Sequence, residues 1–242
     1  MKLLDLTLPS PAGNLACDEA LLNGSEDGKA EEILRFWEPR EYFVVVGYAN
    51  QVETEVDVAA CKANHVPVFR RCSGGGTVLQ GPGCLNYTLV LRITGHHSLA
   101  SISGANKFIM EQNRAAIEST IPDPQFAIAV RGHTDLTIGE RKFSGNSQRR
   151  HRHSLLFHGT FLLNLDLSLV ANFLRAPSKQ PDYRNNRSHT EFLTNLNVPA
   201  TRLKDALGKM WKATGDLCDY PERATQKLVA EKYSAAKWNF KL

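Results

Sequence analysis

The sequence predicts a mixed α/β (α+β) domain. Apolar residues make up 42% of the 242-residue chain and charged residues 22%, which is ordinary globular composition. Apolar positions switch irregularly between the alternation typical of strands and the period typical of helices. The length fits one large domain or two small ones. Because no linker or internal repeat interrupts the chain, we expect a single domain over residues 1–242.

Four apolar runs are typical of strands. The clearest is Val44–Val46, which ends at Gly47 and has the length of a buried strand. β-Branched and aromatic residues mark the others. The predicted strands cover residues 44–46, 87–93, 126–130 and 161–165.

Three segments are typical of helices. Ser103 can cap a helix that continues to Ile117. A second helix follows Thr201, and a third runs from Glu222 to Lys232. The side chains that share one helical face are Ile109, Met110, Asn113 and Ile117 in the first helix, and Leu203, Ala206, Leu207, Met210 and Trp211 in the second.

Residues 176–190 predict a long loop. The segment holds two prolines, two adjacent asparagines and almost no residue to bury. It is either a solvated connection or, where it lies beside a site, a lid.

Charge and cysteine content limit the class of protein. Lys and Arg number 29 against 25 Asp and Glu, which gives a net charge of +4 and a pI near 8.8. This mildly basic balance allows a nucleic-acid or acidic partner but does not require one, and we expect no nucleic-acid partner. No apolar run is long enough to span a membrane, and the polar residues and prolines near the start do not fit a signal peptide. The five cysteines form no CxxC pair, which predicts reduced thiols in a cytoplasmic protein.

Residues 70–78, RRCSGGGTV, form the first candidate site. The consecutive glycines Gly74 to Gly76 let a ligand approach the backbone and let N–H groups face an anion. Arg70 and Arg71 place permanent positive charge beside them. The segment matches neither the Walker loop nor the dinucleotide fingerprint. It is therefore either an anion site of another kind or a tight turn between strands.

Residues 134–145 predict a hairpin with one polar face. Gly139 and Glu140 fit a two-residue type II′ turn. The cross-strand pairs would then be Ile138–Arg141, Thr137–Lys142, Leu136–Phe143 and Asp135–Ser144. One face builds the core, and the other brings the Asp135 carboxylate close to the Lys142 ammonium. A lysine fixed in this way can bind phosphate or a reacting carboxylate; the alternative is a weak ion pair at the surface.

Residues 148–160 combine a basic run with three histidines. His151, His153 and His158 have no acidic or cysteine companion at ligand spacing, and the same holds for His96 and His97, so we expect no histidine-based metal site. The basic run lacks interleaved aromatic residues that could stack on bases. This favours a solvated turn over a nucleic-acid arm.

Together these segments resemble the lipoate–protein ligase A family of the biotin/lipoyl ligase superfamily. Residues 70–78 match the family signature RRxSGGGxV, and residues 139–145 are similar to its G-x-RK-x-SG strand. Further similarity lies in the early strand pair of residues 34–47, in Thr134-Asp135-Leu136, and in residues 158–162 (HGTFL) followed by Asp166-Leu167. The resemblance spans most of the chain.

The resemblance implies a class II synthetase-like, biotin–lipoyl ligase catalytic domain with a mixed, largely antiparallel sheet flanked by helices. It implies a reaction in two steps. Lipoate or octanoate attacks the α-phosphate of ATP, supplied with Mg²⁺, and a lysine of a lipoyl domain then attacks the carbonyl of the acyl-AMP. The implied acceptors are proteins of the 2-oxoacid dehydrogenase E2 or glycine cleavage H-protein type.

The resemblance also implies roles for particular residues. Lys142 would offset the negative charge that grows in both transition states. Asp135 would lie near the nucleotide, either as a magnesium ligand or through hydrogen bonds. The residues implied to bind the acyl adenylate are Arg70, Arg71, Ser73, Gly74, Gly75, Gly76, Thr77, Asp135, His158, Gly159 and Thr160.

The chain departs from the family pattern at several positions. Gln80-Gly81 stands in place of His-Asp, Thr134 in place of Asn, and Gly145-Asn146-Ser147 in place of Gly-Ser-Ala. We also expect the small C-terminal accessory domain of many ligases to be absent. Either a separate subunit then supplies it, or the enzyme works without it, or the reaction differs.

Three other functions stay open at this point. An octanoyltransferase of the same fold uses a cysteine shortly before the strand of Asp135; residues 126–131 hold none, although Cys72 and Cys84 flank the glycines. A biotin ligase is disfavoured because its GRGRxxR loop is missing. A noncatalytic module that senses lipoate or a nucleotide is disfavoured by the intact Lys142.

Overall fold

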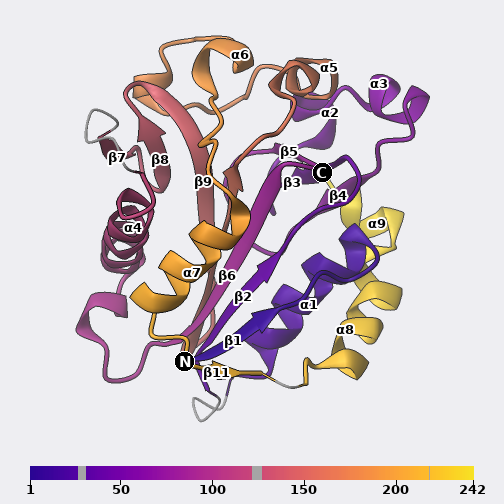
Figure 1. Ribbon diagram of the computed structural model, residues 1–242. Helices are drawn as coiled ribbons and strands as arrows, with labels where there is room; N and C mark the ends of the chain where they lie inside the picture. The colour runs from indigo at the N-terminus through magenta and orange to yellow at the C-terminus, as the bar shows by residue number, and fades with distance from the viewer. Residues whose placement is uncertain (27–30, 122–126, 218) are drawn as a thin grey trace.

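The computed structural model describes residues 1–26, 31–121, 127–217 and 219–242 (Figure 1). Its main sheet has the strand order β11-β1-β2-β6-β10-β9-β8-β7. β1 pairs in parallel with β11 and β2, and every other pairing in this sheet is antiparallel. The strands are β1 Lys2–Asp5, β2 Ile33–Trp37, β6 Cys84–Arg92, β7 Ile128–Arg131, β8 Asp135–Ile138, β9 Arg141–Arg150, β10 Ser154–Leu162 and β11 Gly215–Asp216. The expected mixed, largely antiparallel sheet is thus confirmed.

A second, three-stranded sheet carries the glycine segment. Its central strand is β3 (Phe43–Val46), which pairs in parallel with β4 (Val68–Arg70) and antiparallel with β5 (Val78–Gln80). Residues 71–77 connect β4 to β5. Short helices adjoin this sheet and share its apolar cluster: α2 Val52–Glu55, α3 Val58–Ala63 and α5 Val170–Phe173. β2 and β3, which were expected as a strand pair, therefore lie in different sheets.

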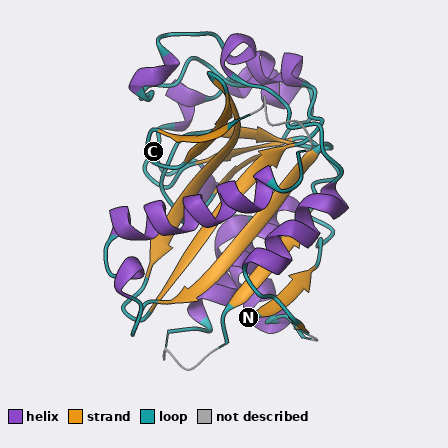
Figure 2. Ribbon diagram, turned by 60° about the vertical axis from the view of Figure 1, so that its left-hand side comes forward, coloured by secondary structure: helices purple, strands orange, loops and turns teal. Residues whose placement is uncertain are grey.

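Helices cover both faces of the main sheet (Figures 1 and 2). On one face, α4 (Ile102–Glu118) and α7 (Ala200–Met210) lie side by side. On the other, α1 (Pro11–Asn23) packs against β6, β10 and α8 (Glu222–Leu228). The remaining helical elements are α6 His189–Phe192, α9 Ala236–Asn239, a π-helical turn at Val229–Tyr233, and 3₁₀ turns at His97–Leu99, Leu167–Leu169 and Asp182–Arg184.

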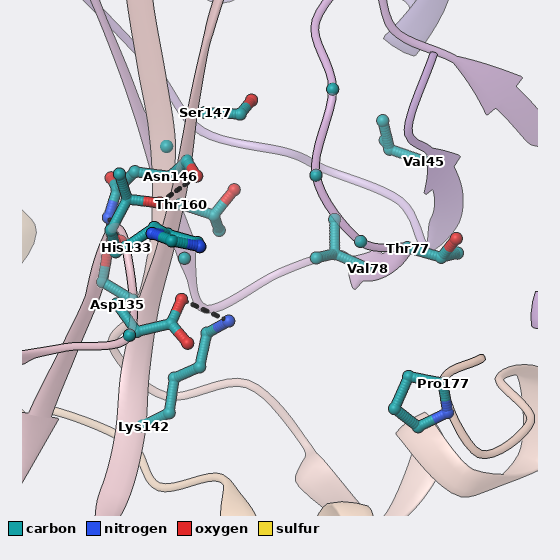
Figure 3. A pocket seen from close by; sticks show the side chains of 18 of the residues that line it. Val45, Thr77, Val78, His133, Asp135, Lys142, Asn146, Ser147, Thr160 and Pro177 are labelled. Atoms are coloured by element: carbon teal, nitrogen blue, oxygen red, sulfur yellow. Dashed lines mark hydrogen bonds and ion pairs between the residues drawn. The ribbon is translucent and has the colours of Figure 1, made fainter. Parts of the chain in front are cut away.

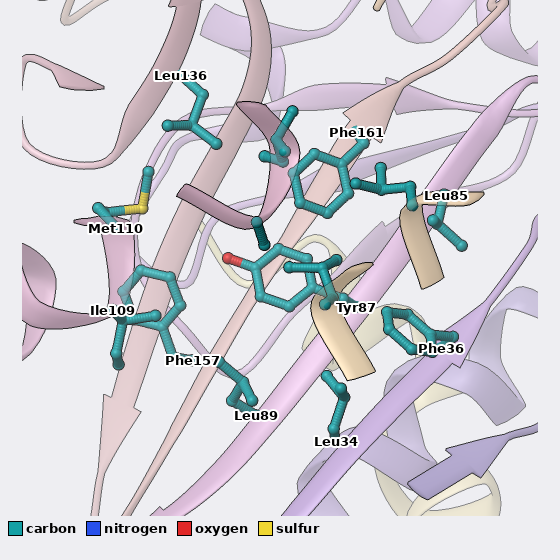
Figure 4. Close-up of a cluster of buried hydrophobic side chains, with 14 of the residues drawn as sticks. Leu34, Phe36, Leu85, Tyr87, Leu89, Ile109, Met110, Leu136, Phe157 and Phe161 are labelled. Carbon is teal, nitrogen blue, oxygen red and sulfur yellow. The ribbon is translucent and has the colours of Figure 1, made fainter. Parts of the chain in front are cut away.

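The largest apolar cluster lies between the main sheet and the pair α4 and α7 (Figure 4). Tyr87 of β6 stacks on Phe161 of β10, with ring centroids 5.0 Å apart. Both rings are fully buried, as are Ile109 and Met110 of α4. Each side chain of this size stabilises the fold by roughly 1.5–3 kcal/mol when it leaves water. This face of the sheet therefore carries the main hydrophobic core, and the candidate site lies on the opposite face, the one that α1 packs against.

Two of the predicted strands are confirmed, in β3 and β6, and β7 begins at Ile128, while Phe126 lies outside the described residues. The strand expected at residues 161–165 is wrong beyond Leu162. Leu163 and Asn164 both donate their N–H groups to the carbonyl of Gly83, which turns the chain away from the sheet.

The predicted helices are confirmed with changed ends. α4 begins at Ile102, because Ser101 rather than Ser103 accepts the N–H of Gly104. The helix expected to reach Lys232 is α-helical only to Leu228 and continues as the π-helical turn. Within the described ranges, no helix has both the length and the apolar character needed to cross a bilayer.

Candidate functional site

A cavity of about 1200 Å³ opens on the α1 side of the main sheet. The main sheet forms its floor, the small sheet and glycine segment form one wall, and residues 174–193 form part of another. The predicted loop, residues 176–190, thus lies beside the site, and it contains one 3₁₀ turn. Apolar side chains that line the cavity include Leu15, Trp37, Val45, Leu79, Leu162 and Val170.

Two cross-strand rows of residues form the floor. The first row, from β8 to β6, comprises Asp135, Gly145, Thr160 and Asn86. The second, from β9 to β2, comprises Ser147, His158, Thr88 and Arg35. Residues paired across strands share a face of the sheet, and their chain neighbours face the apolar cluster under α4. The register therefore brings the hairpin motif and the HGTFL motif onto one surface.

Lys142 lies over this floor (Figure 3). Its Nζ is 2.7 Å from Oδ1 of Asp135, and the Tyr183 hydroxyl donates to Oδ2 of the same carboxylate at 2.8 Å. A Cβ on Gly145 would lie 2.8 Å from that Nζ, so the glycine leaves room for the lysine. Figure 3 shows this ion pair on the side of the cavity opposite Thr77 and Val78.

The hairpin contains a β-bulge that the sequence did not predict. Gly139 has a φ of +55°, as the turn requires, and the pairs Ile138–Arg141 and Thr137–Lys142 are confirmed. The register then shifts, so the other two expected pairs are wrong. The observed pairs are Leu136–Ser144 and Asp135–Gly145. Phe143 is the extra residue, and it is fully buried in the apolar cluster.

Arg71 holds the glycine segment in place. Its guanidinium donates to the carbonyl oxygens of Gly74 and Gly76, and burial lowers its pKa to about 10. Gly75 has a φ of +85°, which other residues rarely adopt. A Cβ on Gly74 or Gly76 would meet no atom within 4 Å. Both therefore present open backbone to the cavity that they line.

Arg70 does not reach the cavity, in contrast to the expectation that it binds the adenylate. Its side chain is fully buried and donates to the carbonyls of Gly47, Tyr48 and Asn50. Its Nε donates to the carbonyl of Trp238. Because these bonds occupy most of the guanidinium, Arg70 ties β4 to neighbouring backbone and contributes to the fold.

Ser73 and His158 meet behind the glycine segment. Oγ of Ser73 is 2.6 Å from Nε2 of His158, and Nδ1 of His158 is 3.3 Å from Oδ2 of Asp18. Arg35 donates to the other oxygen of Asp18. Burial by itself raises the pKa of Asp18, but the Arg35 guanidinium and His158 outweigh this effect, and the pKa is lowered.

The remaining predicted residues lie at the edges of the cavity. Thr160 closes a hydrogen-bonded ring with Gln80 and Asn86. Gly159 is required by packing, since a Cβ there would lie 1.8 Å from Oδ1 of Asn146. Thr77 lines the cavity wall next to Gly76.

The sequence reading missed Asp18, Arg35 and Tyr183. A charged residue inside the apolar run ILRFW was the one signal for Arg35. In the first row, Asn86 likewise interrupts an apolar strand at an alternate position. Asp18 and Tyr183 reach the site only through the tertiary fold, so no local pattern marks them.

No cluster of three or more His, Cys, Asp or Glu side chains able to hold a metal occurs in the described part of the chain. Both oxygens of Asp135 are already bonded, to Lys142 and Tyr183. These contacts show a carboxylate that holds the lysine. The role of Asp135 as a magnesium ligand stays a prediction.

Sequence similarity places this architecture in a family. Residues 10–207, well over half of the chain, match the lipoyl protein ligase A/B catalytic domain. The protein therefore belongs to this family, and it is an enzyme of the lipoate ligase and transferase class.

Curated relatives include both of these activities. Octanoyltransferase LipM of Anoxybacillus flavithermus is 25% identical, over 96% of this chain and 95% of its own. Lipoate-protein ligase A subunit 1 of Thermoplasma acidophilum is 26% identical, over 95% of this chain and 92% of its own.

Solved structures share the fold. A bi-partite lipoate protein ligase of Thermoplasma acidophilum, described with its E2 lipoyl domain, superposes with a TM-score of 0.83 at 23% identity, covering 99% of this chain and 95% of that one. A lipoate-protein ligase A bound with ATP superposes with a TM-score of 0.75 at 25% identity, covering 99% of this chain and 98% of that one.

Proposed function

We propose that this chain is an ATP-dependent lipoate–protein ligase, which forms an acyl adenylate from lipoate or octanoate and transfers the acyl group to a lysine of a lipoyl domain. The observation that carries the proposal is the placement of Lys142 opposite the open glycine segment across one cavity. At about 1200 Å³ this cavity is larger than the roughly 300–1000 Å³ typical of small-ligand pockets. An acyl chain and a nucleotide both fit such a volume.

In this proposal different parts of the cavity wall bind different parts of the substrate. The acyl chain lies along apolar residues such as Leu15 and Val45, and its carboxylate end lies against Gly74 to Gly76. Lys142 leaves Asp135 to bond the carboxylate and phosphate oxygens, and it stabilises the charge that develops on them. Magnesium enters as MgATP, bound to the phosphates of the substrate.

The cysteines favour the ligase over a cysteine-dependent octanoyltransferase. Cys17, Cys61, Cys72 and Cys84 are free and buried, and none of them lines the cavity. Burial raises the pKa of Cys17 and Cys61 to about 11, and that of Cys72 and Cys84 to about 12. A nucleophilic cysteine needs an accessible thiolate, hence a lowered pKa. Cys218 lies outside the described residues.

The likeness to octanoyltransferase LipM makes acyl transfer from a carrier protein the second candidate. ATP–pyrophosphate exchange that depends on lipoate separates the two functions. We expect exchange with the purified chain or with the chain plus an accessory subunit, and full retention of it when each cysteine is changed to alanine in turn. Lysine acylation from octanoyl carrier protein without ATP, lost in one cysteine variant, would contradict the ligase.

We also propose that the chain acts together with a separate accessory subunit. The similar Thermoplasma acidophilum protein is itself named as subunit 1 of a ligase, and the two chains match over nearly their full lengths. The functional unit would then comprise this catalytic chain, a second protein, and the lipoyl domain that accepts the acyl group.

A further inference from the structure

We propose that His158 is a positioning residue, which acts through Ser73 to fix the glycine segment opposite Lys142. Three buried residues lie behind this segment and contact one another in turn. Arg35 contacts Asp18, and Asp18 contacts His158. They come from β2, α1 and β10, and the proposed chemistry gives none of them a part. The kinetic part of this inference depends on the proposed function, whereas its structural part does not.

The hydrogen-bonding chemistry sets the direction of the contacts. An ionised carboxylate only accepts hydrogen bonds, so the Asp18 carboxylate favours the proton of His158 on Nδ1. Nε2 of the neutral imidazole is then an acceptor, and the Ser73 hydroxyl donates to it at 2.6 Å. The Ser73 oxygen in turn accepts from Nε of Arg71 at 3.2 Å and meets Oγ of Ser147 at 2.7 Å.

These bonds make Ser73 the fixed end of the segment. Its hydroxyl is held by His158, Arg71 and Ser147, and its carbonyl accepts the N–H of Tyr48 at 2.9 Å. The next three residues are glycines, whose backbone has the greatest freedom. The orientation of Ser73 therefore sets where the open backbone of Gly74 to Gly76 lies relative to Lys142.

Two substitutions of His158 separate positioning from packing. In His158→Gln the terminal amide reaches the place of Nε2 and can still accept from Ser73. In His158→Asn the shorter amide stays near the place of Nδ1, faces Asp18 and leaves Ser73 without its acceptor. We expect His158→Asn to lower kcat for transfer from lipoyl-AMP by about tenfold or more, as a misplaced contact does, with KM nearly unchanged. His158→Gln should keep most of the activity. Equal losses in two variants that unfold at similar temperatures would overturn the proposal.

A measurement without turnover tests the structural part. Long-range ¹H–¹⁵N correlation of the protein with ¹⁵N-labelled histidine reports which ring nitrogen carries the proton. The spectrum of His158→Asn, or of Ser73→Ala where the former does not fold, assigns the His158 signals. We expect the proton on Nδ1 at neutral pH. A proton on Nε2 would overturn the inference even in an active ligase, and a protein with the expected tautomer but no ligase activity would contradict the proposed function alone.

Discussion

Lys142 and Asp135 form an ion pair that remains partly in contact with water. Their side chains are 22% and 14% exposed. Such a pair contributes little net stability, because solvent screens it and the desolvation of both charges opposes it. The ammonium can therefore exchange the carboxylate for the oxygen atoms of a ligand at small cost. Tyr183 still donates to Asp135 after the lysine has left, so the carboxylate does not lose every partner.

Replacing Lys142 with alanine should abolish charge stabilisation and leave the fold intact. We expect the rate of acyl transfer from lipoyl-AMP to fall by about 10²-fold or more, the effect of removing one donor from an oxyanion site. Lys204→Ala is the matched control. Like Lys142, Lys204 is a partly buried lysine that forms ion pairs with carboxylates, here those of Asp5 and Glu38, but it lies outside the cavity. Near-normal turnover in folded Lys142→Ala would contradict the role given to this residue.

Asp18 links the site to the stability of the fold at low pH. Its pKa is lowered in the folded protein, so its contribution to stability is fully present above the unfolded value, about 3.9, and is lost as the pH falls through the folded value. Asp18→Asn leaves Arg35 buried without a carboxylate, and we expect a loss of about 3–5 kcal/mol near neutral pH. Urea unfolding from about pH 6 to pH 2 should show a smaller decline in stability with acid for this variant. A parallel decline in both proteins would contradict the prediction.

Sequence patterns located several elements, such as β3, β6 and α4, but did not give the full pairing of β8 with β9. The mostly apolar, β-rich run predicted as a strand at residues 87–93 coincides with most of β6, where Tyr87, Leu89 and Leu91 face α4. The turn at Gly139 was also predictable, because its composition fixes its type. The bulge at Phe143 was not, since a change of register depends on which side chain the core accepts.

The role of the glycine segment can be tested by adding a side chain to one of its glycines. Gly74→Val places a side chain into the open space of the cavity wall, where a Cβ meets nothing within 4 Å. We expect lipoate to bind at least about tenfold more weakly in calorimetry, since one blocked contact of this kind costs on the order of 1.4 kcal/mol, with little change in unfolding temperature.

Gly75→Val is a poorer test of the same point. Its positive φ and the contact of its Cβ with Arg71 would strain the segment in the absence of ligand. Gly208→Ala on α7 serves as the control, because it also adds a methyl group in open space but lies away from the cavity. Unchanged lipoate affinity in folded Gly74→Val would show that the segment is only a turn.

The sequence motifs identified residues that line the cavity, but they did not identify the residues that hold those side chains in place. Residues 70–78, 134–145 and 158–162 were predicted as motifs, and the fold brings them to one cavity. Asp18 comes from a helix whose local pattern is unremarkable, and Tyr183 from a loop. Their roles depend on contacts across 140 and 48 positions of the chain, which one sequence read locally does not contain.

The purified chain should perform the second half-reaction more readily than the first. In the proposed function, transfer from supplied lipoyl-AMP requires only the cavity, the glycine segment and Lys142, whereas adenylation also involves an accessory subunit. We expect acylation of a lipoyl domain from lipoyl-AMP without any other protein, and slow acylation from lipoate and MgATP until that subunit is added. Mass spectrometry of the acceptor domain measures both rates. Failure to use lipoyl-AMP, combined with use of octanoyl carrier protein, would favour the transferase.

The contacts of Arg70 join the start of the glycine segment to residues that are synthesised much later. Arg70 donates to the carbonyl of Trp238, the indole of Trp238 donates back to the carbonyl of Arg70, and Asn239 accepts the N–H of Arg70. These partners are translated 168 residues or more after the arginine that precedes the glycines. A nascent chain on the ribosome can thus pair β3 with β4 and form much of the main sheet before Arg70, at the start of the glycine segment, has its contacts with Trp238 and Asn239. The contacts that hold the start of the glycine segment are therefore complete only after Trp238 and Asn239 have been translated.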